Sequence, residues 1–143
     1  MASSFPAGCS ASPAGASTGR GFGSGTLKWD QTEVITAPTV YFGRGQATGI
    51  LEVPAGGEFH LGTASAPITN LRLAFNDAAA GTATANLDFS QTDPIFTAFI
   101  ASDLSIGRET GAANGAATVA NGSLTLGSNS AITLGSLAAP VAL

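Results

Sequence analysis

Two acidic residues, Glu52 and Asp88, occupy equivalent positions in two similar strand-like segments and are the strongest candidates for chemistry in this chain. Lys28 and Thr125 hold the same position in two further segments, so stacked strands would set these side chains in one outward column, about 4.8 Å apart. Neighbouring carboxylates splay apart, share a proton or bind a cation such as calcium. At a separation of about 5 to 5.5 Å they could also serve as the acid and nucleophile of a retaining glycosidase. A solvated acidic surface is the simplest interpretation, with a calcium contact and a glycan-cleaving site as the alternatives.

Tyr41 is a candidate for binding rather than for catalysis. It lies between two apolar residues that are predicted to point inward, so its ring should face solvent, where it could stack on a sugar or pack on a partner. His60 is the only histidine and is expected to be an exposed strand residue, so we predict no histidine-based metal site. We therefore predict no catalytic residue and no cofactor, and the alternative is a carbohydrate-binding or polysaccharide-processing site formed by Tyr41, Glu52 and Asp88.

The segments that carry these residues recur along the chain. Each opens with a leucine that is followed, eight residues later, by another apolar residue; the pairs are Leu27 and Ile35, Leu51 and Phe59, Leu87 and Ile95, and Leu124 and Ile132. Apolar and polar residues alternate within each segment, as in strands that bury one face. The distance between copies varies from 24 to 37 residues while the internal step stays fixed. This combination is typical of stacked coils that are joined by loops of variable length.

A second recurring element predicts one corner in each coil. It reads apolar, variable, apolar, turn former and charged residue, and it occurs at residues 40–44, 73–77 and 104–108. The fourth position holds residue types that reach positive φ at low cost, namely Gly43, Asn76 and Gly107. The fifth position alternates in charge and predicts a structural ladder that fixes the register of the coils, formed by Arg44, Asp77 and Arg108.

Together these patterns predict an all-β fold, a right-handed type of β-solenoid (parallel β-helix) with about three short strands per coil and little or no helix. Residues 1–24, rich in Gly, Ser and Ala, are expected to form a flexible arm, and residues 25–143 a solenoid domain of about three to four coils. The alternative fold is an antiparallel β-sandwich, because Asn121-Gly122 also favours a hairpin turn. The single cysteine, Cys9, lies in the arm and cannot form an internal disulfide.

Three segments of the repeat resemble repeats of large bacterial surface and secreted β-solenoid proteins, including autotransporter passengers. These segments are residues 102–108, 122–127 and 131–135, and the resemblance covers about residues 25 to 135. It implies an extracellular or cell-surface protein, usually much longer, that presents an elongated shaft for adhesion or surface display. This chain is shorter and shows no secretion signal or translocator, so we expect a fragment or one stacking module of an assembly.

The composition argues against several classes of partner. Only 10% of the residues are charged, the net charge is −4, and the five Lys and Arg residues are scattered along the chain. A surface that neutralises phosphates needs clustered cations, so we expect no nucleic-acid binding and no affinity for anionic membranes. No run of about 18 apolar residues occurs, so no membrane span is predicted.

The end of the repeat region suggests where a partner would bind. No charged residue follows Glu109, and the last repeat runs into an apolar segment at residues 138–143. Solenoids normally cover their end coils, because unpaired strand edges promote edge-to-edge association. We therefore expect the C-terminal face to dock on neighbouring repeats or on another copy of the chain. The sequence predicts a non-enzymatic structural or adhesive module of a bacterial surface protein or phage fibre; a self-assembling filament subunit is a further alternative, with surface glycans as alternative partners.

Overall fold

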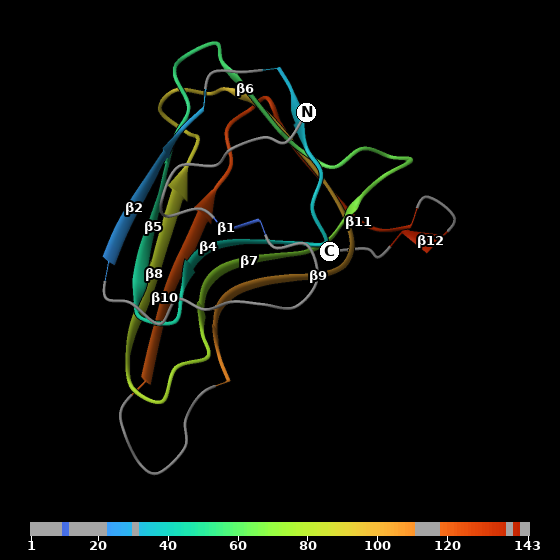
Figure 1. Cartoon of the computed structure of the whole chain (residues 1–143). Helices are drawn as coiled ribbons and strands as arrows, with labels where there is room; N and C mark the ends of the chain where they lie inside the picture. Colours follow the sequence, from blue (N-terminus) through green and yellow to red (C-terminus); the bar gives the residue numbers. More distant parts are fainter. Residues whose placement is uncertain (1–9, 12–22, 30–31, 111–117, 137–138, 141–143) are drawn as a thin grey trace.

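The structure of the chain is a computed structural model that describes residues 10–11, 23–29, 32–110, 118–136 and 139–140. Within these ranges every regular element is a β-strand and no helix is present, which confirms the predicted all-β class. The strands form two sheets, one of four strands and one of eight (Figure 1). The apolar core is formed by buried residues of both sheets.

The four-stranded sheet contains the leucine-led segments side by side in chain order. Its strands are all parallel and comprise β2 (Gly23–Lys28), β5 (Ala47–Glu52), β8 (Gly81–Asp88) and β10 (Thr118–Thr125). Leu27 pairs with Leu51, and Leu87 pairs with Leu124, which confirms the predicted alignment of these leucines within each pair. Polar residues such as Lys28 and Glu52 alternate with the leucines and face outward, because successive side chains of a strand point to opposite faces.

The eight-stranded sheet is mostly parallel as well. Its main path runs through β1 (Ser10–Ala11), β4 (Thr39–Arg44), β7 (Ile68–Asn76), β9 (Ile95–Glu109), β11 (Ser130–Ser136) and β12 (Ala139–Pro140), while β3 (Val34–Ile35) and β6 (Glu58–Leu61) pair beside it. Only two pairs, β1 with β4 and β11 with β12, are antiparallel among the described strands. The long strand β9 pairs with β6 along its first part and with β7 along the rest. It therefore corresponds to two separate strands of the preceding passage.

The chain passes repeatedly from the four-stranded sheet to the eight-stranded sheet, and each passage adds its strands beside those of the passage before. We call these passages layers: layer one is β2 to β4, layer two is β5 to β7, layer three is β8 and β9, and layer four is β10 and β11. Figure 1 shows the four strands of the smaller sheet along one side, with β4, β7 and β9 stacked beside one another on the other. Layers one and two have the three short strands that the sequence predicted, whereas layers three and four have two.

Aromatic rings join successive layers inside the core. The rings of Phe59 in layer two and Phe96 in layer three stack with their centroids 5.9 Å apart. Phe89 lies 4.7 Å from Phe96 within layer three. Trp29 meets Phe59 edge to face at 5.7 Å. Burial of such rings supplies much of the hydrophobic free energy of a small β-fold, so the core rests on contacts between adjacent layers.

The apolar residues that follow each leading leucine by eight positions align less well between layers than the leucines do. Phe59 pairs with Phe96 rather than with Ile95, and Ile95 pairs with Glu58 and is 44% exposed. The predicted equivalence of Ile95 with Phe59 is therefore wrong, and Ile95 lies on the outer face because a register shift of one residue moves a side chain to the opposite face of a sheet. Ile132 pairs with Ala98, which aligns it with Leu61 instead of Phe59, and this shift of two residues keeps the side chain on the core side.

The corner prediction is confirmed at two of its three positions. Gly43 and Gly107 have φ values of 66° and 67°. The third corner residue is Ala74, with a φ of 52°, so the assignment of this role to Asn76 is wrong. Phe42 pairs with Leu73 and Leu73 with Ile106, which places the middle copy two residues earlier than the sequence suggested. Alternation in residues 71–75 fits both registers, so the apolar pattern alone could not separate them.

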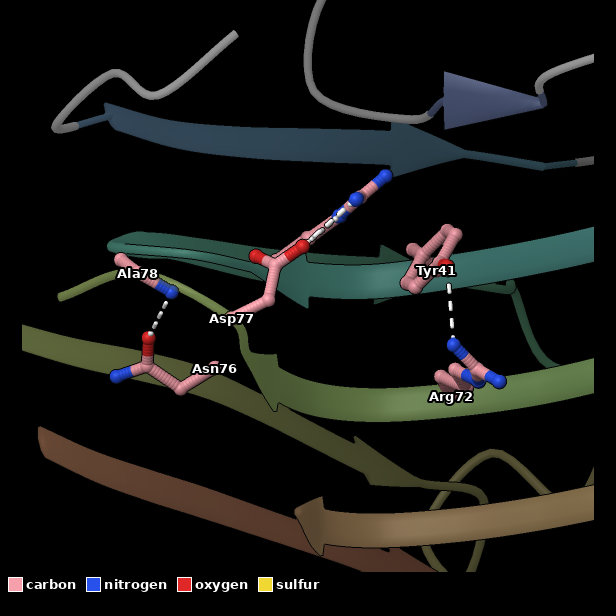
Figure 2. Close-up of polar contacts among 6 residues, drawn as sticks. Tyr41, Arg72, Asn76, Asp77 and Ala78 are labelled. Atoms are coloured by element: carbon pink, nitrogen blue, oxygen red, sulfur yellow. Dashed lines mark hydrogen bonds and ion pairs between the residues drawn. The ribbon is translucent and has the colours of Figure 1, made fainter. Parts of the chain in front are cut away.

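Asn76 has a different role, because it is a fully buried link between layers. Its Nδ2 donates hydrogen bonds to the carbonyl oxygens of Gly81, at 2.7 Å, and of Val119, at 3.0 Å. Its Oδ1 accepts a hydrogen bond from the Ala78 backbone N–H at 3.0 Å (Figure 2). A single side chain thus satisfies backbone groups in the loop after β7, at the start of β8 and in β10.

The antiparallel alternative is also wrong for the described strands. Asn121 and Gly122 lie within β10 and pair in parallel with Thr84 and Ala85, so they form no hairpin turn. Of the predicted arm, the structure describes residues 10–11, which form β1 on β4, and residues 23–24, which belong to β2. Cys9 lies outside the described residues.

Candidate functional site

The two predicted acidic residues lie at the ends of neighbouring strands, and each has its own partner. Glu52 forms an ion pair with Lys28, with 3.2 Å between Oε2 and Nζ. Asp88 Oδ1 accepts hydrogen bonds from the Ser90 hydroxyl at 2.6 Å and from the Ser90 backbone N–H at 2.9 Å. These donors hold the pKa of Asp88 below its usual value, whereas the acid of a glycosidase needs a raised pKa. The arrangement favours a solvated acidic surface over a catalytic pair.

Groups that could hold a metal were sought in the described ranges. No three His, Cys, Asp or Glu side chains gather there in a way that could coordinate an ion, and the calcium contact stays a prediction. His60 differs from the exposed strand residue that we expected. It is half-buried, with Nδ1 2.7 Å from the Thr97 hydroxyl and Nε2 2.9 Å from a Glu58 carboxylate oxygen. The histidine therefore links two adjacent strands, β6 and β9.

Tyr41 is covered by arginine side chains. It is half-buried, with the Arg44 guanidinium 4.6 Å and the Arg72 guanidinium 5.7 Å from the centre of its ring. Arg72 Nη1 donates a hydrogen bond to the Tyr41 hydroxyl at 3.2 Å (Figure 2). Phe75 packs on the same ring at 5.8 Å. These contacts compete with the sugar stacking proposed for Tyr41, which also lies on the other sheet from Glu52 and Asp88.

The predicted charge ladder is wrong as a column, although Arg44 and Asp77 do form an ion pair. Both Nε and Nη2 of Arg44 donate to Asp77 Oδ2, at 3.0 and 2.6 Å. However, Phe75 rather than Asp77 occupies the column between Arg44 and Arg108, which follows from the two-residue shift at the corner. Arg108 instead lies 3.6 Å from Asp103.

Sequence reasoning missed two members of this charged group, Arg72 and Asp103. Arg72 Nε lies 3.4 Å from the same Asp103 oxygen that Arg108 approaches, and its guanidinium lies 4.5 Å above the Phe75 ring. Arg72 pairs with Tyr41 in register, so correct alignment of the middle copy would have revealed it. The group consists of side chains that neutralise one another, which points to a structural role for this surface.

Asp93 joins layers three and four. Its carboxylate accepts hydrogen bonds from the Ser128 hydroxyl, from the Asn129 backbone N–H at 3.1 Å and from Asn129 Nδ2 at 3.1 Å. The Ser128 hydroxyl and then the Asn129 N–H hold the pKa of Asp93 below its usual value. Because its pKa is lowered in the folded state, the carboxylate stabilises the fold above its ordinary pKa, and this stabilisation is lost as the pH falls through the lowered pKa.

We expect Asp93→Asn to lower the thermal unfolding temperature at neutral pH and to weaken the loss of stability between about pH 5 and pH 2. The reason is that an amide cannot accept all of these hydrogen bonds and does not titrate. Asp88→Asn is the matched comparison, because the Asp88 bonds stay within one loop, and it should have the smaller effect. Circular dichroism melts across this pH range measure both. An Asp93→Asn chain with the full acid sensitivity of the parent would refute the assignment.

The last candidate is the C-terminal face, where the core columns of the stack end. In one column Phe42 is 1% exposed and Leu73 is fully buried, while Ile106, the next in register, is 44% exposed. The neighbouring column ends in Leu126, also 44% exposed, beside the buried Phe89. We define the C-terminal face by the apolar residues of layers three and four that are half-buried or exposed at this end: Leu104, Ile106, Leu124, Leu126, Ile132 and Leu134.

Two strand edges border this face. Within the described residues, β10 pairs only with β8, and the part of β9 from Asp103 to Glu109 pairs only with β7. The other ends of the core columns, in layer one, are covered: Leu27, Val40 and Phe42 are buried, and β1 pairs antiparallel with β4. Among the described residues, the core columns are therefore covered in layer one and partly exposed at the C-terminal face, although the outer edge of β2 is also unpaired.

Comparison with protein-family models, with curated proteins and with solved structures gives no match to this chain. Within the ranges that the structure describes, no helix is long and apolar enough to span a membrane.

Proposed function

We propose that the chain is a non-catalytic β-solenoid module, a structural or adhesive part of a larger extracellular surface protein or fibre of bacterial or phage origin. In this proposal the C-terminal face is its functional site, and the bound partner is another layer of β-structure. The parallel addition of four layers, each beside the one before, supports the solenoid, because a solenoid is built by stacking successive coils.

One observation carries the proposal, namely the burial gradient along the core columns. Equivalent side chains are buried in the inner layers and 44% exposed at Ile106 and Leu126. A soluble chain rarely leaves a contiguous apolar surface and two unpaired strand edges together unless a partner covers them. Covering an exposed apolar side chain of this size contributes on the order of 1 kcal/mol. The two exposed residues, Ile106 and Leu126, therefore favour association, and the four partly buried residues of the face add to this.

The contacts of the acidic residues support a structural rather than an enzymatic role. Glu52 is paired with Lys28, Asp88 is held ionised by Ser90, and Tyr41 lies under two arginines. A carbohydrate-binding site would need these groups to converge on one surface, whereas the sheet order places Tyr41 apart from the two carboxylates. The glycan alternative therefore enters as the competing outcome of the test.

The test measures the mass of the full chain by light scattering across a concentration series, with negative-stain microscopy of the same samples. We expect discrete oligomers or rods at high concentration, because the C-terminal face then becomes covered. A glycan array is probed in parallel with the parent and with the Glu52→Gln/Asp88→Asn double variant. A chain that stays monomeric and binds a glycan only when both carboxylates are present would overturn the structural role.

A further inference from the structure

We infer that the partner at the C-terminal face is a second copy of this chain, docked through its own C-terminal face, so that two copies form a closed twofold pair. This inference rests on the proposed docking role and adds the identity and orientation of the partner. In such a pair the same surface serves both copies, and each core continues into the other.

The covered core columns of layer one disfavour the other way of joining two copies. Head-to-tail growth would place the C-terminal face of one copy against layer one of the next. There β1 already pairs with Val40 and Tyr41 of β4, and the layer-one side chains Leu27, Ile35 and Phe42 are buried. Growth in that direction would have to displace β1 and would gain little apolar contact. Although the outer edge of β2 is also unpaired among the described strands, contact between two C-terminal faces covers more apolar surface than head-to-tail contact.

Charge favours the same contact. The chain carries a net charge of −4, so two copies repel each other over most of their surfaces. Residues 118–136, which form β10, β11 and their connection, contain no charged side chain. On the β9 edge, Arg108 lies between the acidic residues Asp103 and Glu109, so a twofold contact can set each arginine near a carboxylate of the other copy.

The unpaired edges supply the remaining argument. An exposed edge strand is a template for further pairing, and natural proteins protect such edges with charges, prolines or bulges. Strand β10 has no charged residue and no proline. On the β9 edge, the Ser105 hydroxyl is buried without a hydrogen-bond partner among the described residues. A docked copy covers the apolar columns and brings polar backbone groups to both edges.

The first test uses sedimentation and light scattering of the full chain and of two variants. The parent should have twice its 14.0 kDa chain mass, independent of concentration once paired. Ile106→Lys should reduce the mass to that of one chain, because a charge is buried without a partner in the contact. Ile95→Lys is the matched control, since Ile95 lies on the same strand, is equally 44% exposed and faces away from the C-terminal face, and it should stay paired. Leu126→Lys repeats the test on another element in case Ile106→Lys does not fold.

Each other outcome overturns a defined part of the argument. Rods that lengthen with concentration would show that docking occurs but is open-ended, which rejects the twofold pair alone. A persistent monomer would reject both the pair and the docking role. A pair that survives both lysine variants at the C-terminal face would show that association uses another surface, and this too rejects the inference.

The orientation is tested by spin labels in a Cys9→Ser chain. A label at Asn121→Cys, on the exposed side of β10, should give a single short distance between the two copies. The same label at Thr36→Cys, which is exposed in layer one, should give a much longer one. Equal distances at the two sites would indicate a head-to-tail arrangement and would reject the twofold contact.

Discussion

Replacing Gly43 with alanine is expected to abolish stable folding. A β-carbon at this position would lie 2.1 Å from the carbonyl oxygen of Thr84 and 2.8 Å from its carbonyl carbon. Both atoms belong to the backbone of β8, so no side chain can rotate away, and the two sheets would have to separate at the corner. The residue also has a φ of 66°, which costs an alanine about 1 kcal/mol or more. We expect a total loss of more than about 4 kcal/mol, enough to unfold many small domains.

Gly56→Ala separates the two contributions. Gly56 has a similar φ of 71°, but nothing lies within 4 Å of the β-carbon that would be added there. This substitution should cost only the free energy of holding an alanine at positive φ, about 1 kcal/mol, and the variant should still unfold in a cooperative transition. Urea unfolding followed by circular dichroism measures both variants. If Gly43→Ala unfolds with nearly the same free energy as Gly56→Ala, the close approach of the two sheets at Gly43 is wrong.

Loss of the Asn76 side chain has the second-largest expected effect. Asn76→Ala leaves two carbonyl oxygens, of Gly81 and Val119, and the N–H of Ala78 without their partner in a fully buried site. Each unsatisfied buried group costs about 1 to 3 kcal/mol, so we expect a loss of about 3 kcal/mol or more in the free energy of unfolding.

The control for this prediction is Asn70→Ala. Asn70 is half-buried and makes one side-chain hydrogen bond, to the Thr39 hydroxyl at 2.9 Å, so its loss should cost about 1 kcal/mol. Hydrogen exchange adds a second measurement, because Asn76→Ala should also weaken protection in β10, which the side chain reaches across layers. Equal stability losses for the two variants would show that Asn76 is not the link that its contacts describe.

The sequence predicted the strands better than the alignment between them. Alternation and the leading leucines identified the all-β class and the pairing of Leu27 with Leu51, because both depend on local patterns. Two registers of the middle corner that differ by two residues give the same alternation of apolar and polar positions, so the pattern could not distinguish them. The positive φ of 52° at Ala74 could not be predicted either, because alanine is not a residue type that indicates a positive φ. Ile95 failed for a related reason, since the number of residues in the preceding turn shifted it to the outer face.

One missed signal was present in the sequence. Two residues before each leading leucine stands a small residue, and these form a column at Gly25, Gly49, Ala85 and Gly122. A β-carbon at Gly49 would lie 2.4 Å from the nitrogen of Gly43, and one at Gly122 would lie 2.7 Å from that of Gly107. The column therefore allows the sheets to meet at the corners. The charged group around Arg72 could not be found in this way, because it depends on the corrected register.

The position of the C-terminal face also bears on how the chain acquires its fold. A ribosome makes layer one first and layer four last, so every completed layer presents its free edges and apolar columns on the side where the next segment emerges. Strand pairing runs only between neighbouring passages, so each layer can pair with the one before it as soon as it is made. Contacts such as those of Gly43 with Thr84 and of Asn76 with Val119 then join layers that are two apart. This pairing order permits folding in the direction of synthesis, and at each stage the last layer made presents the surface that the next layer or a partner would cover.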